Sequence, residues 1–337
     1  MTAQAKTPSG GRLKRVAAET LTIRRLKRGR GFSYDDGEGH VTRDAETLAR
    51  IRSLAIPPAY ADVRIAADPR AHLQAVGRDD AGRIQHRYHP DWERVRERRK
   101  LAKLGHLVGA LPKIRAAIAR DLKLRTLSKQ KALACAACLI DRCHIRVGSE
   151  SYAKENGSYG ASTLLKRHAA VVGGRVELKF RGKSGKDISC SCDFAPLARA
   201  LTRIMTLPGR RLFQYRRDDG TVGALRAGDI NAYLAEAAGM KVSSKDLRML
   251  AANAAAAELL LASDIATSET ARKRQLADIM RAISERLVNT PAVVRKSYVH
   301  QVVVQSYATG KLKRSYERAR ARNGCTRIER ALGLLSQ

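Results

Sequence analysis

The spacing of hydrophobic and polar residues divides the chain into two parts. Between Phe32 and about Trp92, short apolar runs alternate with polar residues and are broken by turn sequences, which is typical of β-strands. The stretch "AHLQAVGRDDAGRIQHRYH" predicts two strands joined by an Asp-Asp-Ala-Gly turn. We therefore expect a small β-rich domain, residues 31–95, preceded by a basic N-terminal lead-in, residues 1–30.

From Glu93 onward, helical spacing dominates. The segment "WERVRERRKLAKLGHLVGALPKIRAAIARDL" has apolar residues at helical intervals, and Pro112 predicts a helix boundary within it. Further along, "SSKDLRMLAANAAAAELLLASD" predicts an Ala- and Leu-rich helix with Ser243 or Ser244 as its N-cap. The second domain is expected to be mainly α-helical and to span residues 96–337.

One hairpin interrupts the predicted helices. In "GRVELKFRGKSGKDISCSC", apolar residues occupy every second position on both sides of an Arg-Gly-Lys-Ser-Gly turn. These positions are Val176, Leu178, Phe180, Ile188, Cys190 and Cys192. The pattern predicts a β-hairpin with Lys183 at its tip, and the fold class is α+β.

The net charge indicates the kind of partner. The 337 residues include 65 Lys and Arg against 32 Asp and Glu, a formal charge of +33, while a hydrophobic content of 44% is enough for folded cores. Such an excess favours a polyanion, DNA or RNA, because binding to phosphates releases counterions. A ribosomal or histone-like protein would fit this charge equally well.

Membrane and metal sites are not indicated. No stretch reaches the ~18 consecutive apolar residues of a membrane span, and the N-terminus lacks the apolar core of a signal peptide, which predicts a cytoplasmic protein. Cys135 and Cys138 form a C-x-x-C without a second pair at zinc spacing. We expect the cysteines to be packing residues and no metal to be bound.

Five residues of the second domain suit one reaction, the attack of a phenol on a phosphodiester. In chain order they are Arg146, Lys183, Arg248, Asn289 and Tyr298. Guanidinium groups match the oxygens of a phosphoryl transition state, and nearby cations lower the pKa of a tyrosine nucleophile. A lysine at a hairpin tip can protonate the departing oxygen. This chemistry requires neither a metal nor a nucleotide cofactor.

Several segments together resemble one known family, the bacterial, poxvirus-like type IB DNA topoisomerases. The resemblance runs from about Thr22 to Tyr298 and is carried by "RGRGFSYDD", "IPPAY", "GRIQHRYHPDW", "IRVGSESYAKENGSYGASTL", "FRGKSGK", "KDLR" and "VNTPAVVRKSY". It implies an isomerase that relaxes supercoils through a 3′-phosphotyrosyl intermediate. It also implies a monomer whose two domains form a C-shaped clamp on double-stranded DNA at the bacterial nucleoid.

The resemblance also implies roles for individual residues. Arg146 and Arg248 match the two catalytic arginines of the family. Lys183 matches its general acid and Tyr298 its nucleophile. Three residues of the β-rich domain fall where the family reads the DNA major groove: Gln85, His86 and Tyr88.

Two other readings share part of this pattern. A tyrosine recombinase uses similar Arg-Lys-Arg-Tyr chemistry, but usually has a histidine where this chain has Lys245. A catalytically inactive nucleoid protein would explain the charge but not the ordered set of residues. Tyr307 and Tyr316 are rival nucleophiles, but neither follows an Asn-Thr-Pro sequence as Tyr298 does.

Asn289 departs from the commonest family pattern, in which a histidine donates to a nonbridging oxygen. A neutral hydrogen bond contributes about 0.5–1.5 kcal/mol, against about 1.5–3 for a charged one. We therefore expect Asn289→His to accelerate DNA cleavage by up to roughly tenfold and Asn289→Ala to slow it, as measured in single-turnover cleavage. An unchanged rate in both variants would exclude this role.

Overall fold

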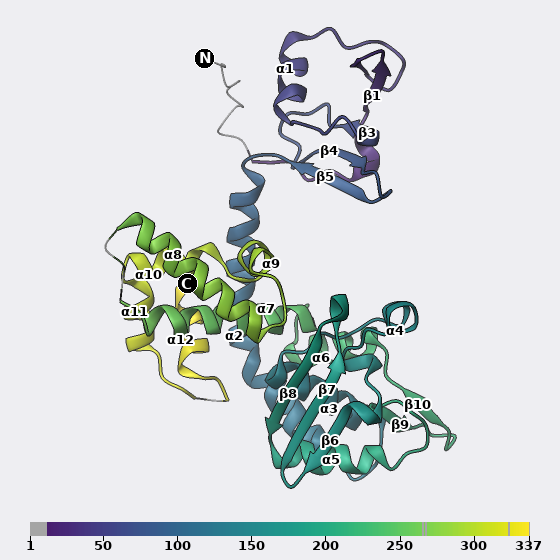
Figure 1. The fold of residues 1–337 in the computed structure, drawn as a ribbon, viewed down its shortest axis with the longest axis vertical. Helices are drawn as coiled ribbons and strands as arrows, with labels where there is room; N and C mark the ends of the chain where they lie inside the picture. The colour runs from purple at the N-terminus through teal and green to yellow at the C-terminus, as the bar shows by residue number, and fades with distance from the viewer. Residues whose placement is uncertain (1–11, 265, 267, 323, 337) are drawn as a thin grey trace. The chain divides into compact units, whose positions relative to one another are not determined.

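The computed structural model describes residues 12–264, 266, 268–322 and 324–336, and the described chain divides near Arg99 into two compact units (Figure 1). Helix α2 (Trp92–Leu122) runs across this boundary in the sequence. The other elements of the first unit are β1 (Ile23–Arg28), β2 (Gly31–Asp35), α1 (Ala45–Ser53), β3 (Ala61–Ile65), β4 (Leu73–Arg78) and β5 (Ile84–Tyr88).

The first unit is an antiparallel sheet with strand order β2-β1-β3-β4-β5. Its buried hydrophobic residues form two clusters: Ile23, Ile51, Val63, Ile65 and Ala75 in one, and Leu21, Ala66, Ala71 and Leu73 in the other. The hairpin expected from "AHLQAVGRDDAGRIQHRYH" is confirmed as β4 and β5. The N-terminal part of the fold is thus β-rich, as predicted.

Part of the segment expected as a basic lead-in belongs to this sheet. Strand β1 pairs with both β2 and β3, and Ile23 is buried in the core while Arg24, Lys27 and Arg28 are exposed. The basic composition reflects the solvent-facing positions of a strand, which charge alone does not distinguish from a tail. Residues 1–11 of the expected lead-in lie outside the described residues.

The second unit combines helices with two small sheets. Its helices are α3 (Lys129–Cys143), α4 (Glu150–Asn156), α5 (Ala195–Met205), α6 (Ala227–Ala238), α7 (Ser244–Leu261), α8 (Glu269–Arg286), α9 (Pro291–Val293), α10 (Gln301–Ala308), α11 (Lys311–Arg318) and α12 (Arg327–Leu335). Its strands are β6 (Ala169–Val172), β7 (Arg175–Arg181), β8 (Asp187–Asp193), β9 (Gln214–Arg216) and β10 (Val222–Ala224). A π-helical turn, Val294–Tyr298, follows α9.

Helix α3 is the centre of this unit. Its residues from Ala132 to Ile140 are all buried, so the helix is apolar on every side, as expected of a helix enclosed by others. It packs against α5, α6, α7 and β8, and Figure 1 shows it against the β6-β7-β8 sheet. Cys135 and Cys138 belong to this packed core, and all six cysteines are free thiols.

Two local predictions are confirmed here and one is wrong. The predicted hairpin is the β7–β8 pair, and α7 begins after Ser243. Pro112, however, lies inside α2 instead of at a boundary. Leu111 and Ile114 on either side are fully buried, so core packing offsets the hydrogen bond that the proline removes.

Within the described residues, no helix has the length and apolar character needed to cross a membrane.

One ionic cluster joins α2, α3 and α12. The Arg115 guanidinium donates to both carboxylate oxygens of Asp141 at 2.8 and 3.0 Å and to both of Glu329 at 2.9 and 2.8 Å. Burial by itself would lower the pKa of Arg115, but hydrogen bonds to Glu329 and Asp141 outweigh it and raise the pKa. The cluster fixes the C-terminal helix to the end of α3.

Replacing Arg115 by Met should destabilise the second unit. Two mostly buried carboxylates would lose their common partner, and breaking a buried ion pair costs on the order of 3 kcal/mol. Urea unfolding followed by circular dichroism measures the free energy. As a matched control, Arg94→Met breaks an exposed pair with Asp91 and should change the free energy of unfolding by less than ~1 kcal/mol. Equal effects of the two variants would contradict the structural role of Arg115.

Candidate active site

Arg146 lies just beyond the C-terminus of α3. The helix ends at Cys143, and the residue after it, His144, has a left-handed φ of 54° that turns the chain toward the site. The Arg146 carbonyl accepts a hydrogen bond from the Ala161 N–H at 2.8 Å. A Cβ on Gly160 would lie 2.6 Å from the same carbonyl, so this close approach requires glycine. The backbone of Arg146 is therefore fixed from two sides.

Arg248 occupies the second turn of α7, a helix whose start is capped by Asp246, which accepts from the Ser243 N–H at 2.9 Å. The Arg248 side chain is buried, at 4% exposure. Within the described residues it forms no ion pair with a carboxylate, and its Nε has no hydrogen-bond partner. A buried guanidinium in this state is a ready binding group for an anion.

The C-terminus of α8 orients both arginines. Arg248 donates to the Leu287 carbonyl at 3.0 Å, and Arg146 donates to the Val288 carbonyl at 3.4 Å. Arg146 also donates to the side-chain oxygen of Asn289. Both backbone carbonyls belong to the turn directly after α8, which ends at Arg286, and so lie at the negative end of the helix dipole, where cations are favoured. The side-chain nitrogen of Asn289 is buried without a partner and remains available as a donor.

Tyr298 ends the π-helical turn and is held through its backbone. The fully buried Asn253 of α7 donates to the Tyr298 carbonyl at 2.9 Å and to the Met249 carbonyl at 2.7 Å. The Asn253 oxygen accepts from the His300 N–H at 2.8 Å. One amide thus fixes the chain on both sides of Val299, directly after Tyr298. The phenol points toward Arg248, whose guanidinium carbon lies 5.8 Å from the ring centroid.

The surroundings of Tyr298 favour its ionised form. Burial alone would raise the pKa of the phenol, but the charges of Arg248 and Arg146, with polar contacts from Arg248 and Asn289, hold it below its usual value of 10. Burial lowers the pKa of the His144 imidazole to about 4, so this ring adds no charge beside Arg146 at neutral pH. The two arginines are the source of the positive potential at the phenol.

Four of the predicted residues meet in one open pocket. Arg146, Lys183, Arg248 and Tyr298 line a cavity of about 770 Å³, and no aspartate or glutamate is among the residues that line it. Asn289 is joined to the cavity wall through Arg146. The five residues that the sequence suggested are thus brought together, although 152 positions separate the first from the last (298 − 146).

Lys183 is exposed on a short turn, Lys183–Gly185, between β7 and β8. Its ammonium group makes no hydrogen bond or ion pair within the described part of the chain. The next lysine along, Lys186, is tied down, since its Nζ donates to the Asn289 carbonyl at 3.1 Å. The tip of the hairpin therefore carries one free and one anchored lysine.

The three residues predicted to read DNA lie on β5 of the first unit but do not share a face. His86 and Tyr88 are exposed on one face with their rings stacked, 5.9 Å between centroids. Gln85 alternates to the opposite face, where its side chain donates to Asp79 at 2.9 Å. His86 and Tyr88 are thus available to a ligand together, whereas Gln85 has a partner within its own unit.

Sequence reasoning missed two residues of the site. Asn253 was hidden in an Ala- and Leu-rich helix, although a lone amide in "AANAAAAELLL" is a recognisable signal of a buried polar contact. Lys186 was missed because attention fell on Lys183, three residues earlier.

The rival tyrosines have other contacts. The Tyr307 hydroxyl donates to the Ser263 carbonyl at 2.7 Å, and Arg327 lies over the Tyr316 ring.

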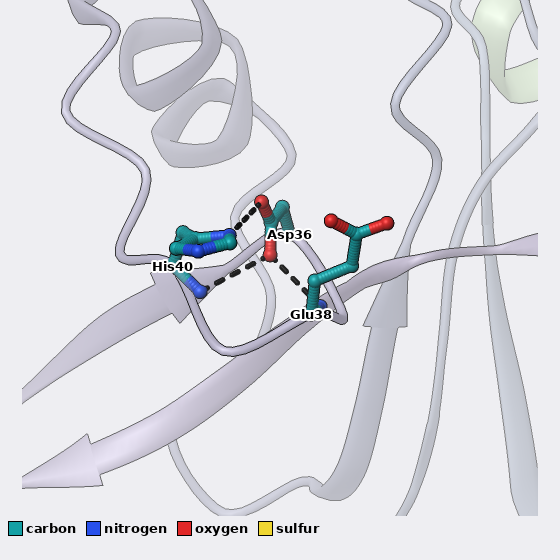
Figure 2. Close-up of side chains that lie close together, drawn as sticks. All are labelled: Asp36, Glu38 and His40. Atoms are coloured by element: carbon teal, nitrogen blue, oxygen red, sulfur yellow. Dashed lines mark hydrogen bonds and ion pairs between the residues drawn. The ribbon is translucent and has the colours of Figure 1, made fainter.

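A further group of side chains, in the first unit, has ligand-like chemistry. Figure 2 shows Asp36, Glu38 and His40 close together in an exposed turn. The Asp36 carboxylate accepts from the N–H groups of Glu38 at 2.8 Å and of His40 at 3.2 Å, and its second oxygen contacts the His40 ring. These bonds account for the shape of the turn without a metal ion.

The pKa of Tyr298 can be measured without DNA. The difference in phenolate absorbance between the wild type and Tyr298→Phe should titrate with a midpoint below 10, because the other tyrosines cancel. Arg248→Gln removes the charge that favours the phenolate and should move this midpoint upward. Arg281→Gln, an exposed change on α8, should leave it unchanged. If Arg248→Gln left the midpoint of the Tyr298 titration unchanged, the electrostatic role of Arg248 would be contradicted.

Comparisons with known proteins identify the family of the chain. The profile of the family described as eukaryotic DNA topoisomerase I, catalytic core, matches residues 89–324. The profile of the bacterial DNA topoisomerase IB N-terminal domain matches residues 31–79. The chain is 32% identical over 295 residues to DNA topoisomerase 1B of Acanthamoeba polyphaga mimivirus, covering 85% of this chain and 87% of the viral protein. With both profiles and this relative in agreement, the chain belongs to the type IB DNA topoisomerases.

Proposed function

We propose that this protein relaxes positive and negative supercoils by cutting and resealing one strand of duplex DNA, with Tyr298 as the nucleophile. The observation that carries the proposal is the meeting of a tyrosine, two arginines and a lysine in one pocket without acidic residues. Such a pocket attracts a phosphodiester and offers a group for each step of its cleavage.

The first step is attack by the Tyr298 oxygen on phosphorus. An ordinary tyrosine is ionised in about one molecule in a thousand at pH 7, which costs on the order of 4 kcal/mol. The lowered pKa of Tyr298 reduces this cost. The backbone contacts of Asn253 keep the phenol beside the arginines, which supports attack from a fixed position.

The transition state carries negative charge on the nonbridging oxygens. The unpartnered Arg248 Nε and Asn289 side-chain nitrogen are buried donors that a phosphate would satisfy. Arg146 adds a second guanidinium, already oriented by its bond to Asn289. Together these groups stabilise the developing charge without a metal ion.

In the second half of the step, the bond from phosphorus to the 5′ oxygen breaks. Lys183 donates a proton to this oxygen, while the new phosphotyrosine bond conserves the energy of the phosphodiester. The free 5′ end can then rotate about the intact strand before it attacks the phosphotyrosine. The cycle is balanced without ATP, because the bond that breaks is the one that is restored.

The DNA partner follows from the same features. The +33 charge supports contacts to phosphates along a duplex, and His86 with Tyr88 offers an aromatic surface to it. We expect the protein to act as a monomer, since all five proposed catalytic residues come from one chain, and to be located at the nucleoid.

The test is relaxation of negatively and positively supercoiled plasmid in EDTA without ATP. The wild type should relax both, and Tyr298→Phe should lose at least ~10³-fold in rate while retaining DNA binding. Tyr307→Phe is a matched control, since this hydroxyl is engaged by Ser263, and should remain active. Relaxation by Tyr298→Phe, or a requirement for ATP or a metal ion, would contradict the proposal.

A further inference from the structure

Three consecutive carbonyls at the end of α8 accept hydrogen bonds from three cations. Leu287 and Val288 hold the two arginines of the pocket, and the third carbonyl, that of Asn289, accepts from Lys186 at 3.1 Å. Lys186 comes from the β7–β8 hairpin, 103 positions earlier in the chain. The hairpin is therefore fastened to the same helix end that orients the arginines.

The hairpin tip is a small closed loop. The Gly182 N–H donates to the Lys186 carbonyl at 2.7 Å, so the five residues from Gly182 to Lys186 move as one piece. Ser184 and Gly185 have φ values of 60° and 71°, a left-handed conformation that is costly for Ser184 unless the loop is held from outside. The contact between Lys186 and Asn289 is such an external anchor.

Lys183 depends on this anchor because it has none of its own. Its ammonium group makes no hydrogen bond or ion pair to the described residues. The Lys183 side chain is exposed to solvent and forms part of the pocket lining. A proton donor must lie within about 3 Å of the atom that it protonates, and a flexible lysine on a free loop would rarely meet this condition.

We infer that Lys186 is a positioning residue, which docks the hairpin on the C-terminus of α8 and thereby holds Lys183 at the departing 5′ oxygen. A charge-assisted hydrogen bond to the carbonyl of Asn289, in the turn after α8, is suited to this task, since the negative end of the helix favours a third cation beside the two arginines. The inference rests on the proposed role of Lys183 as general acid.

The test compares two duplex substrates, one with oxygen and one with sulfur at the bridging 5′ position. A thiolate has a far lower proton affinity than an alkoxide and departs without general acid, so the sulfur substrate removes the need for Lys183. Single-turnover cleavage is measured at saturating DNA. The variants are Lys186→Met, Lys186→Arg, Lys183→Ala and the double variant Lys183→Ala/Lys186→Met, with Lys179→Met as an exposed lysine control on β7.

With the oxygen substrate, we expect Lys183→Ala to lose 10²–10⁴-fold in rate and Lys186→Met to lose roughly tenfold. The double variant should be no slower than Lys183→Ala alone, because the two residues act on one step. With the sulfur substrate, all variants should cleave within about threefold of the wild type. Lys186→Arg should recover most of the rate, since a guanidinium can donate to the same carbonyl, and Lys179→Met should match the wild type.

Other results would overturn the role. An equal loss by Lys186→Met with both substrates would mean that Lys186 acts on the nucleophile side, through Asn289. A change confined to affinity, with a weaker salt dependence, would make it a phosphate contact. Failure of the wild type to cleave either substrate would overturn the proposed function itself, and this role with it.

Discussion

The proposed active site depends on the turn that follows one helix. Three consecutive carbonyls after Arg286, the last residue of α8, accept hydrogen bonds from three cations of three other segments. The carbonyls of Ile283, Ser284 and Glu285 in the helix itself are satisfied by backbone N–H groups of this turn. The turn thus brings Arg248, Arg146 and Lys186 from distant parts of the sequence to one point. The negative end of α8 offsets the mutual repulsion of the cations, so the cluster can form before any DNA is bound.

Two arginines of this chain show opposite uses of burial. Arg115 is paired with Asp141 and Glu329, and all its charge is neutralised within the protein. Arg248 is more deeply buried, yet its partners are the Leu287 carbonyl and the Tyr298 phenol, with no carboxylate, and its Nε is unpaired. The paired Arg115 joins three helices. Arg248, in contrast, has an uncompensated positive charge that an anion would neutralise. Burying the Arg248 guanidinium without a carboxylate lowers the stability of the free protein. Because this group is already desolvated when a phosphate binds, the same arrangement favours phosphate binding.

Elements that depend on neighbouring residues could be predicted from the sequence, whereas features that depend on packing between distant segments could not. The β7–β8 hairpin and the Ser243 cap follow from short patterns and are confirmed. Pro112 was misjudged because the core on both sides of it outweighs its own preference. Strand alternation was sufficient to place Gln85 opposite His86, but the family resemblance had grouped them. The Lys186 contact joins residues 103 positions apart and could not be read from either segment alone.

The hydrogen bonds that Asn253 makes with the Tyr298 carbonyl and the His300 N–H have a mechanical consequence. In the proposed intermediate, the phenol is the covalent link between the DNA and the protein, so torque in the cleaved strand passes into the backbone of the π-helical turn. Asn253 links that turn to the middle of α7, the helix that also carries Arg248. Asn253 itself is fully buried, so the load is passed to the core of the unit. The main-chain hydrogen bonds of Asn253 therefore hold the proposed nucleophile in place while the DNA strand is under torque.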